Sequence, residues 1–109
     1  MAVYVDKAQH QLGRMIMCHM LADTIHELHT MADRLGLPRA WYQATSNPHY
    51  DLSKGKRKDA VALGCIELDR RQVGQLIQDR RPTWVAEAMV QHRQYLQDLN
   101  AQLAARRAS

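Results

Sequence analysis

The sequence contains no phenylalanine, only two cysteines and only 6% aromatic residues in 109 positions. A disulfide-rich scaffold is excluded, because small domains of that kind carry several pairs of cysteines. Cys18 and Cys65 each lie in an apolar run. This setting favours two buried, reduced thiols, with a disulfide or a thiolate ligand as the alternative. Without phenylalanine, we expect the core to depend on aliphatic side chains and on the six methionines.

Long hydrophobic runs are also missing. No apolar stretch approaches the ~18 residues of a membrane-spanning helix, and residues 1–20 lack the basic and apolar regions of a secretory signal. We therefore expect a cytoplasmic protein without membrane association. Hydrophobic residues make up 46% of the chain and charged residues 24%, which is an ordinary balance for one small globular domain.

Basic residues outnumber acidic ones by 15 to 11, giving a net charge of +4. Such an excess favours contact with nucleic acid or nucleotide phosphates, and it is equally compatible with a solvated basic surface. The basic residues gather in four short groups: Lys54–Lys58, Arg70–Arg71, Arg80–Arg81 and Arg106–Arg107.

Short β-favouring runs alternate with helical patterns, which is typical of a small α/β or α+β domain with a few-stranded sheet and flanking helices. Thr24 and Glu27 form a capping-box pattern that predicts a helix start, and Gly36 predicts its end. A second capping box, Asp69 to Gln72, predicts another helix. The other expected elements are strands at residues 3–5, 15–18, 40–43 and 65–68, a helix at 54–63 and a polar loop at 7–13.

The C-terminal part of the chain has a different pattern. Pro82 and Thr83 predict a break between a domain of residues 1–81 and a long helix of residues 82–109. From there, mostly apolar residues recur at alternating intervals of four and three residues, which is the pattern of a heptad seam. We expect this seam to pack either on its own domain or on a second copy of the chain, as a homodimer. The seam consists of Val85, Met89, His92, Leu96, Leu99 and Leu103.

Four of the six histidines lie in two polar clusters, at residues 19–29 and 49–51. Imidazole and carboxylate groups together suit a metal site or an acid–base site. Both clusters would have to fold around one pocket. The candidate catalytic residues are His19, Asp23, His29, His49 and Asp51. The candidate ligands of a divalent Zn, Mn or Mg ion are His19, Asp23, His49 and Asp51.

Two further groups surround this expected pocket. Asp6 and His19 each follow an expected strand, so they would face one cleft if the strands are neighbours. Arg14, Lys56 or Arg57 would hold a phosphate-bearing ligand, and Asp6 is a further candidate residue nearby for binding a cofactor. Structural roles are the alternative: Asp23 would interact with a helix dipole and Asp51 would cap a helix.

The order of these motifs resembles a family common in bacteriophage and prophage genomes, catalogued as domain of unknown function 4031. The resemblance rests on MAVYVD, on GRMIMCHMLADTIHELHTMADRLG, on HYDLS and on KRKDAVALG, and it covers residues 1–68. It implies a phage origin and a shared site at the two polar clusters, and it supplies no activity.

The leading hypothesis from the sequence is a small phage-encoded protein whose pocket binds a nucleotide or nucleic acid and performs metal-assisted hydrolysis. The main alternative is a non-catalytic protein that binds a host factor or defence complex in the host cytoplasm. A third possibility is nucleic-acid binding without chemistry, through the basic runs and exposed aromatic rings.

Overall fold

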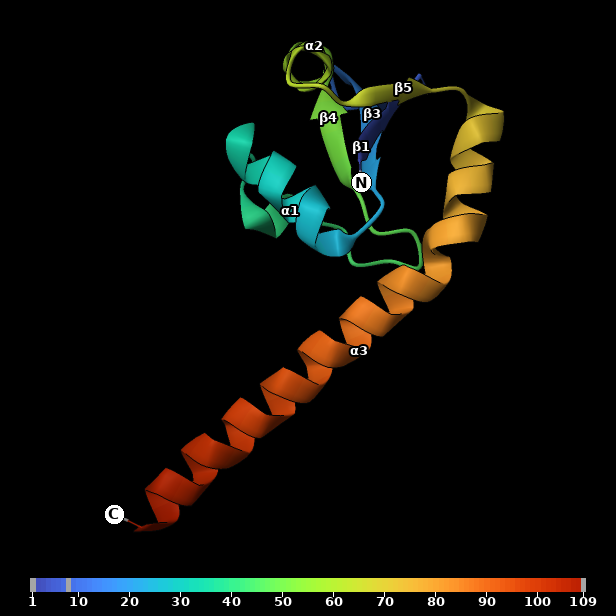
Figure 1. Ribbon diagram of the computed structural model, residues 1–109. Helices are drawn as coiled ribbons and strands as arrows, with labels where there is room; N and C mark the ends of the chain where they lie inside the picture. The colour runs from blue at the N-terminus through green and yellow to red at the C-terminus, as the bar shows by residue number, and fades with distance from the viewer. Residues whose placement is uncertain (1, 8, 109) are drawn as a thin grey trace.

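A computed structural model describes residues 2–7 and 9–108, except for the side chains of Gln11 and Leu12. The chain forms a small α+β domain with a long C-terminal helix (Figure 1). The strands are β1 (Val3–Asp6), β2 (His10–Leu12), β3 (Met15–Ala22), β4 (Tyr50–Ser53) and β5 (Ile66–Leu68). The helices are α1 (Ile25–Arg34), the 3-10 turn η1 (Arg39–Trp41), α2 (Lys54–Ala62) and α3 (Arg70–Ala108).

The long strand β3 organises the mixed sheet. Strand β1 pairs antiparallel with residues 20–22 of β3, and β2 pairs antiparallel with residues 15–17. These two strands therefore lie one after the other along the same edge of β3. Strand β4 pairs antiparallel with residues 17–20 of β3, and β5 extends the sheet by pairing parallel with β1. Successive residues of β3 face opposite sides of the sheet.

Helices cover both sides of the sheet. Helices α1 and α2 lie on one side and the first part of α3 on the other (Figure 1). The α1/α2 side holds the larger core, which includes Val5, Met20, Leu28, Tyr50 and Leu52. The α3 side holds a smaller cluster formed by Leu21, Ile25, Leu76 and Trp84.

Most helix boundaries agree with the sequence signals. The Thr24 hydroxyl accepts from the amide of Glu27 at 3.1 Å, and Gly36 has a left-handed φ of 71° after α1. The reciprocal bonds between Asp69 and Gln72, at 2.9 and 2.8 Å, confirm the second capping box. The strand expected at residues 40–43 is wrong, because the 3-10 turn occupies residues 39–41.

The break expected at Pro82 is also wrong. Helix α3 runs from Arg70 through Pro82 to Ala108, and its axis changes direction partway along (Figure 1). Proline lacks an amide hydrogen and its ring crowds the preceding turn, so it bends this helix without ending it. Beyond the bend, Trp84 Nε1 donates to the carbonyl of Ala22 at 3.0 Å. The Glu87 carboxylate accepts from the first amide of α1, that of Ile25, at 2.7 Å.

The remainder of α3 projects away from the domain (Figure 1). Its heptad positions Val85, Met89, Leu96, Leu99 and Leu103 are exposed. Among the residues that the structure describes, no helix is both long and apolar enough to cross a membrane.

Candidate metal centre

Three histidine rings surround one carboxylate oxygen on the α3 side of the sheet. The Nε2 atoms of His10 and His19 each lie 3.8 Å from Asp51 Oδ1, and His49 Nε2 lies 3.6 Å from the same atom. The rings of His10 and His19 stack with centroids 4.8 Å apart, and the His49 ring meets that of His19 edge-on at 5.2 Å. Three nitrogen atoms therefore converge on one oxygen.

Strand register produces this convergence. His19 in β3 lies directly opposite Asp51 in β4, and His10 in β2 lies opposite Met17, two residues before His19. Directly paired residues and residues two apart on one strand share a face, so His10, His19 and Asp51 point to the same side. An isolated antiparallel β-bridge pairs Gln43 with His49, the residue that directly precedes β4.

The separations are too long for hydrogen bonds. Asp51 Oδ1 is buried and has no hydrogen-bond partner among the described residues, although three ring nitrogens approach it. Bonds of 2.0–2.1 Å in a tetrahedral zinc site place neighbouring ligand atoms about 3.3 Å apart. The observed 3.6–3.8 Å is therefore slightly wider than a metal-bound arrangement. His10, His19 and Asp51 each offer an atom within 4.8 Å of the other two.

Neighbouring groups fix the orientation of two rings. Asp6 Oδ2 lies 2.6 Å from His19 Nδ1, and the backbone carbonyl of Asn47 lies 2.7 Å from His49 Nδ1. Both oxygens accept hydrogen bonds, so the proton of a neutral ring resides on Nδ1. The lone pair of each Nε2 then faces the cluster, as in carboxylate–histidine–metal arrangements.

Asp6 and Gln43 complete the surroundings of the cluster. The hydrogen bond that His19 donates to the Asp6 carboxylate raises the pKa of His19 more than partial burial lowers it. Gln43 Nε2 donates to Asp51 Oδ2 at 2.7 Å, which leaves Oδ1 directed at the rings. The sequence expectation that Asp6 and His19 share a cleft is confirmed.

A hollow of about 240 Å³ adjoins the cluster. Asp6, His19 and His49 line it from the sheet side, and Val73 and Ile77 of α3 line its apolar wall. Helix α3 therefore limits the size of any ligand that reaches the imidazoles from this side.

Asp23 lies in a different network from the cluster. Its carboxylate accepts from the amide of Ala2 at 2.7 Å, from the Tyr4 hydroxyl at 2.8 Å and from Arg80 Nε at 2.8 Å. The structure therefore does not bring Asp23 to the expected ligand set, because this carboxylate joins the N-terminal segment to α3.

His29 is the other expected residue that the structure places elsewhere. It belongs to α1, where Nδ1 lies 2.7 Å from the hydroxyl of the buried Tyr50. Tyr50 precedes Asp51 in β4 and therefore faces the opposite side of the sheet. Burial lowers the pKa of His29.

The expected phosphate-binding residues also separate. Arg14 is exposed in the turn between β2 and β3. Lys56 Nζ donates to the carbonyl of Leu35 at 2.8 Å, at the end of α1. Arg57 Nε donates to the backbone carbonyl of Asp6 at 3.0 Å, and its Nη1 lies 2.9 Å from Glu67 Oε1. Only Asp6 is in contact with the histidine cluster.

Sequence reasoning missed His10. The segment 7–13 was expected to be a polar loop, whereas residues 10–12 form β2. The available signal was the pair Gly13-Arg14 between two stretches that can pair as a hairpin. Gly13 has φ 61°, which suits the first position of a two-residue hairpin turn.

A family model of proteins of unknown function, DUF4031, matches residues 3–80 of the chain. The match covers more than two thirds of the 109 residues and extends into α3, beyond the limit of residue 68 expected from the motifs. It includes all four residues of the cluster. No curated protein and no solved structure matches the chain significantly. The chain, with its His/Asp cluster on the α3 side of the sheet, therefore belongs to the DUF4031 family.

Proposed function

We propose that this protein is a metal-dependent hydrolase whose divalent ion is held by His10, His19 and Asp51. The supporting observation is the approach of three imidazole nitrogens to one buried carboxylate oxygen at 3.6–3.8 Å. A buried carboxylate oxygen without a partner is costly, and a cation at this point would compensate it.

The choice of metal follows from the donor atoms. Magnesium and calcium prefer oxygen ligands, whereas imidazole nitrogens suit zinc, iron, nickel and copper. Two histidines and one carboxylate are a known ligand set of catalytic zinc, with a fourth position left for water. We therefore propose zinc or another late first-row ion in preference to magnesium or manganese.

The reaction class follows from this open position. A divalent ion lowers the pKa of its bound water and polarises a phosphoryl or carbonyl oxygen. His49 lies beside the ligand set and lines the adjoining hollow, so it would exchange a proton with the reacting group. The hollow of about 240 Å³ favours a small substrate. A small phosphate-bearing molecule is our proposed substrate class.

The first experiment measures metal. Purified protein is stripped with a chelator, reloaded with zinc, and its metal content is determined by mass spectrometry alongside that of Asp51→Asn and His10→Ala. We expect about one ion per chain in the wild type and loss of the ion in both variants. His92→Ala is the matched control, because His92 lies in the exposed part of α3.

Three outcomes would contradict this proposal. These are wild-type protein that binds no late first-row ion, Asp51→Asn that retains it, and His92→Ala that loses it. Hydrolysis is tested separately with a chromogenic phosphate ester, for which we expect zinc-dependent turnover that His49→Ala reduces by about 100-fold.

A second candidate function, association through the end of α3, is favoured by its exposed apolar stripe. An isolated helix with such a stripe is marginally stable in water unless a partner covers the stripe. The seam alternates steps of four and three from Val85 to Leu103, the spacing at which two helices pack together. We propose a second copy of the chain as the partner, because the same seam is available on every copy.

Sedimentation velocity tests this association. We expect a dimer for the wild type and a monomer for the double variant Leu96→Glu/Leu99→Glu. Gln94→Glu/Gln97→Glu is the control, because it adds the same charge next to the seam. A monomeric wild type at high concentration, or a control that dissociates equally, would remove this candidate.

We further propose the biological origin of this protein and the compartment in which it acts. The motifs of its family support a bacteriophage or prophage origin, and hence action in the cytoplasm of the host cell. Two buried free cysteines, Cys18 and Cys65, fit a reducing compartment. A host protein or defence complex as partner of the tail would be detected as a mixed complex in the same sedimentation experiment.

A further inference from the structure

A second hollow, larger than the one beside the histidines, lies between α2 and the β1–β2 edge of the sheet. Its volume is about 530 Å³, within the range of small-molecule sites. We define it as the α2 hollow, after the helix that forms one of its walls. The residues that line it are Lys7, Gln9, Ile16, Met17, Cys18, Leu52, Lys54, Arg57, Lys58, Val61 and Glu67.

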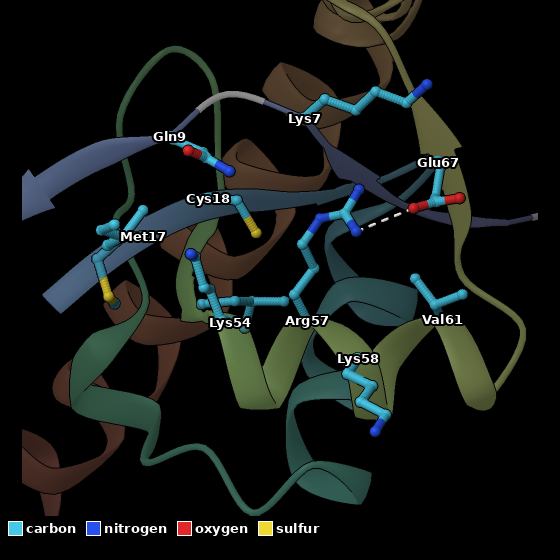
Figure 2. A pocket seen from close by; sticks show the side chains of 11 residues that line it. Lys7, Gln9, Met17, Cys18, Lys54, Arg57, Lys58, Val61 and Glu67 are labelled. Carbon is cyan, nitrogen blue, oxygen red and sulfur yellow. Dashed lines mark ion pairs between the residues drawn. The ribbon is translucent and has the colours of Figure 1, made fainter.

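The charge of the α2 hollow is strongly positive. Four of its lining side chains are cationic and one, Glu67, is anionic. Figure 2 shows Arg57 near the centre, with Lys54 and Gln9 on one side and Glu67 on the other. The ends of Lys7 and Lys58 point away from the centre, so Lys54 and Arg57 are the cations best placed to meet a ligand. Concave surfaces lined by one sign of charge concentrate the opposite ion.

Arg57 is held in place within the α2 hollow. Its Nε donates to the carbonyl of Asp6 at 3.0 Å, and its Nη1 pairs with Glu67 at 2.9 Å. A guanidinium fixed in this way offers its remaining N–H groups in a set direction, which suits a phosphate. Helix α2 also begins at Lys54, so the positive end of its dipole adjoins this wall.

The rest of the wall is apolar. Ile16, Met17, Leu52 and Val61 line the α2 hollow beside the cations. A phosphate group alone would leave this surface uncovered, whereas a nucleotide supplies an apolar ring together with its phosphate. The combination therefore points to a nucleotide-sized ligand with at least one phosphate.

We propose that the α2 hollow binds a nucleotide phosphate, either of a free nucleotide or at the end of a nucleic-acid strand, with Lys54 and Arg57 as its contacts. This site is separate from the histidine cluster. Cys18 and Leu52 line it from the α1/α2 side of the sheet, whereas His19 and Asp51, their neighbours in sequence, face α3. The proposal does not depend on the metal.

The experiment measures binding of three fluorescent probes by anisotropy: a mononucleotide, a short 5′-phosphorylated single strand and the same strand without the phosphate. We expect Lys54→Glu to weaken binding of the phosphate-bearing probes by about tenfold or more. Arg71→Glu is the matched control, since Arg71 is exposed and does not line the α2 hollow. Circular dichroism verifies that each variant is folded.

The probes distinguish the two sources of phosphate. A mononucleotide that binds at least as tightly as either strand identifies a free nucleotide, and tighter binding of the phosphorylated strand identifies a strand end. With a chelator present, so that neither protein holds metal, Asp51→Asn should bind the probes as the wild type does. The proposal is overturned if no phosphate-bearing probe binds at millimolar concentration, or if Lys54→Glu and Arg71→Glu weaken binding equally.

Discussion

The carboxylate of Asp6 binds His19 at two points: Oδ1 accepts from the backbone amide at 2.8 Å and Oδ2 lies 2.6 Å from ring atom Nδ1. Asp6 is buried at the end of β1, whereas His19 is partly exposed in β3. The strand that holds the carboxylate therefore also fixes the direction of the ring. This contact connects the fold of the sheet to the proposed metal centre.

Asp6→Asn should weaken metal binding without removing a ligand. An amide is a poorer acceptor than a carboxylate, so His19 loses orientation and basicity, and comparable substitutions around metal sites cost about 10–100-fold in affinity. Competition with a chromophoric chelator measures the change. Asp33→Asn is the control, because Asp33 is exposed and pairs with Arg39 at 3.1 Å. Equal affinity of Asp6→Asn and wild type would show that the contact serves folding alone.

The network around Asp23 gives a prediction for stability. Burial alone would raise the pKa of Asp23, but the hydrogen bonds from Arg80, Tyr4 and the Ala2 amide together hold it below its ordinary value of 3.8. A carboxyl with a depressed pKa in the folded state stabilises the fold above its unfolded pKa. This stabilisation is lost as the pH falls through the folded pKa.

Asp23→Asn should therefore lower the free energy of unfolding by about 1–3 kcal/mol at pH 7. The difference from wild type should shrink as the pH falls below 3.8 and through the lower pKa of the folded state, where the wild-type carboxyl itself becomes protonated. Urea unfolding at several pH values measures both quantities. A difference that stays constant down to the lowest pH at which the protein folds would contradict this assignment.

The fold was largely predictable because its local signals are strong. The capping boxes at Thr24 and Asp69 and the left-handed Gly36 were recognised, and each marks a helix boundary in the structure. The end of a helix expected at Pro82 is wrong, because a proline on its own does not distinguish a bend in a helix from its end. A contact of Trp84 with the end of β3 and one of Glu87 with the start of α1 hold the helix beyond this bend, and such tertiary contacts leave no local trace.

The candidate site was predicted only in part, for a related reason. His19, His49 and Asp51 were grouped by sequence clustering, and strand pairing does bring them together. Clustering also grouped Asp23 and His29 with them. Asp23 lies four residues beyond His19, about 13 Å further along the extended chain, where it contacts Arg80. His29 belongs to α1, on the other side of the sheet. His10 was missed because a three-residue strand is too short to show an alternating pattern.

Trp84 should contribute strongly to the attachment of α3. Its ring is buried in the cluster with Leu21, Ile25 and Leu76. We expect Trp84→Ala to lower the free energy of unfolding by about 3–5 kcal/mol, as for other buried aromatic residues. Val90→Ala is the control, because Val90 is 62% exposed and should change stability by less than about 0.5 kcal/mol. Similar effects of the two substitutions would show that this part of α3 is detached in solution.

Gly13 tests whether the β2–β3 turn positions the proposed ligand His10. Its φ of 61° is costly for a residue with a Cβ, although no atom outside its two chain neighbours lies within 4 Å of the Cβ position. We expect Gly13→Ala to destabilise the protein by about 1 kcal/mol. The affinity for zinc should also fall, because β2 begins at His10 and ends next to this turn.

Gly74→Ala, within α3, is the matched control. It should stabilise the protein by about 0.5–1 kcal/mol without changing the affinity for zinc. Isothermal titration with zinc separates these cases, since a loss of affinity confined to Gly13→Ala would place His10 among the ligands. Unchanged affinity in a destabilised Gly13→Ala would exclude the turn from that role.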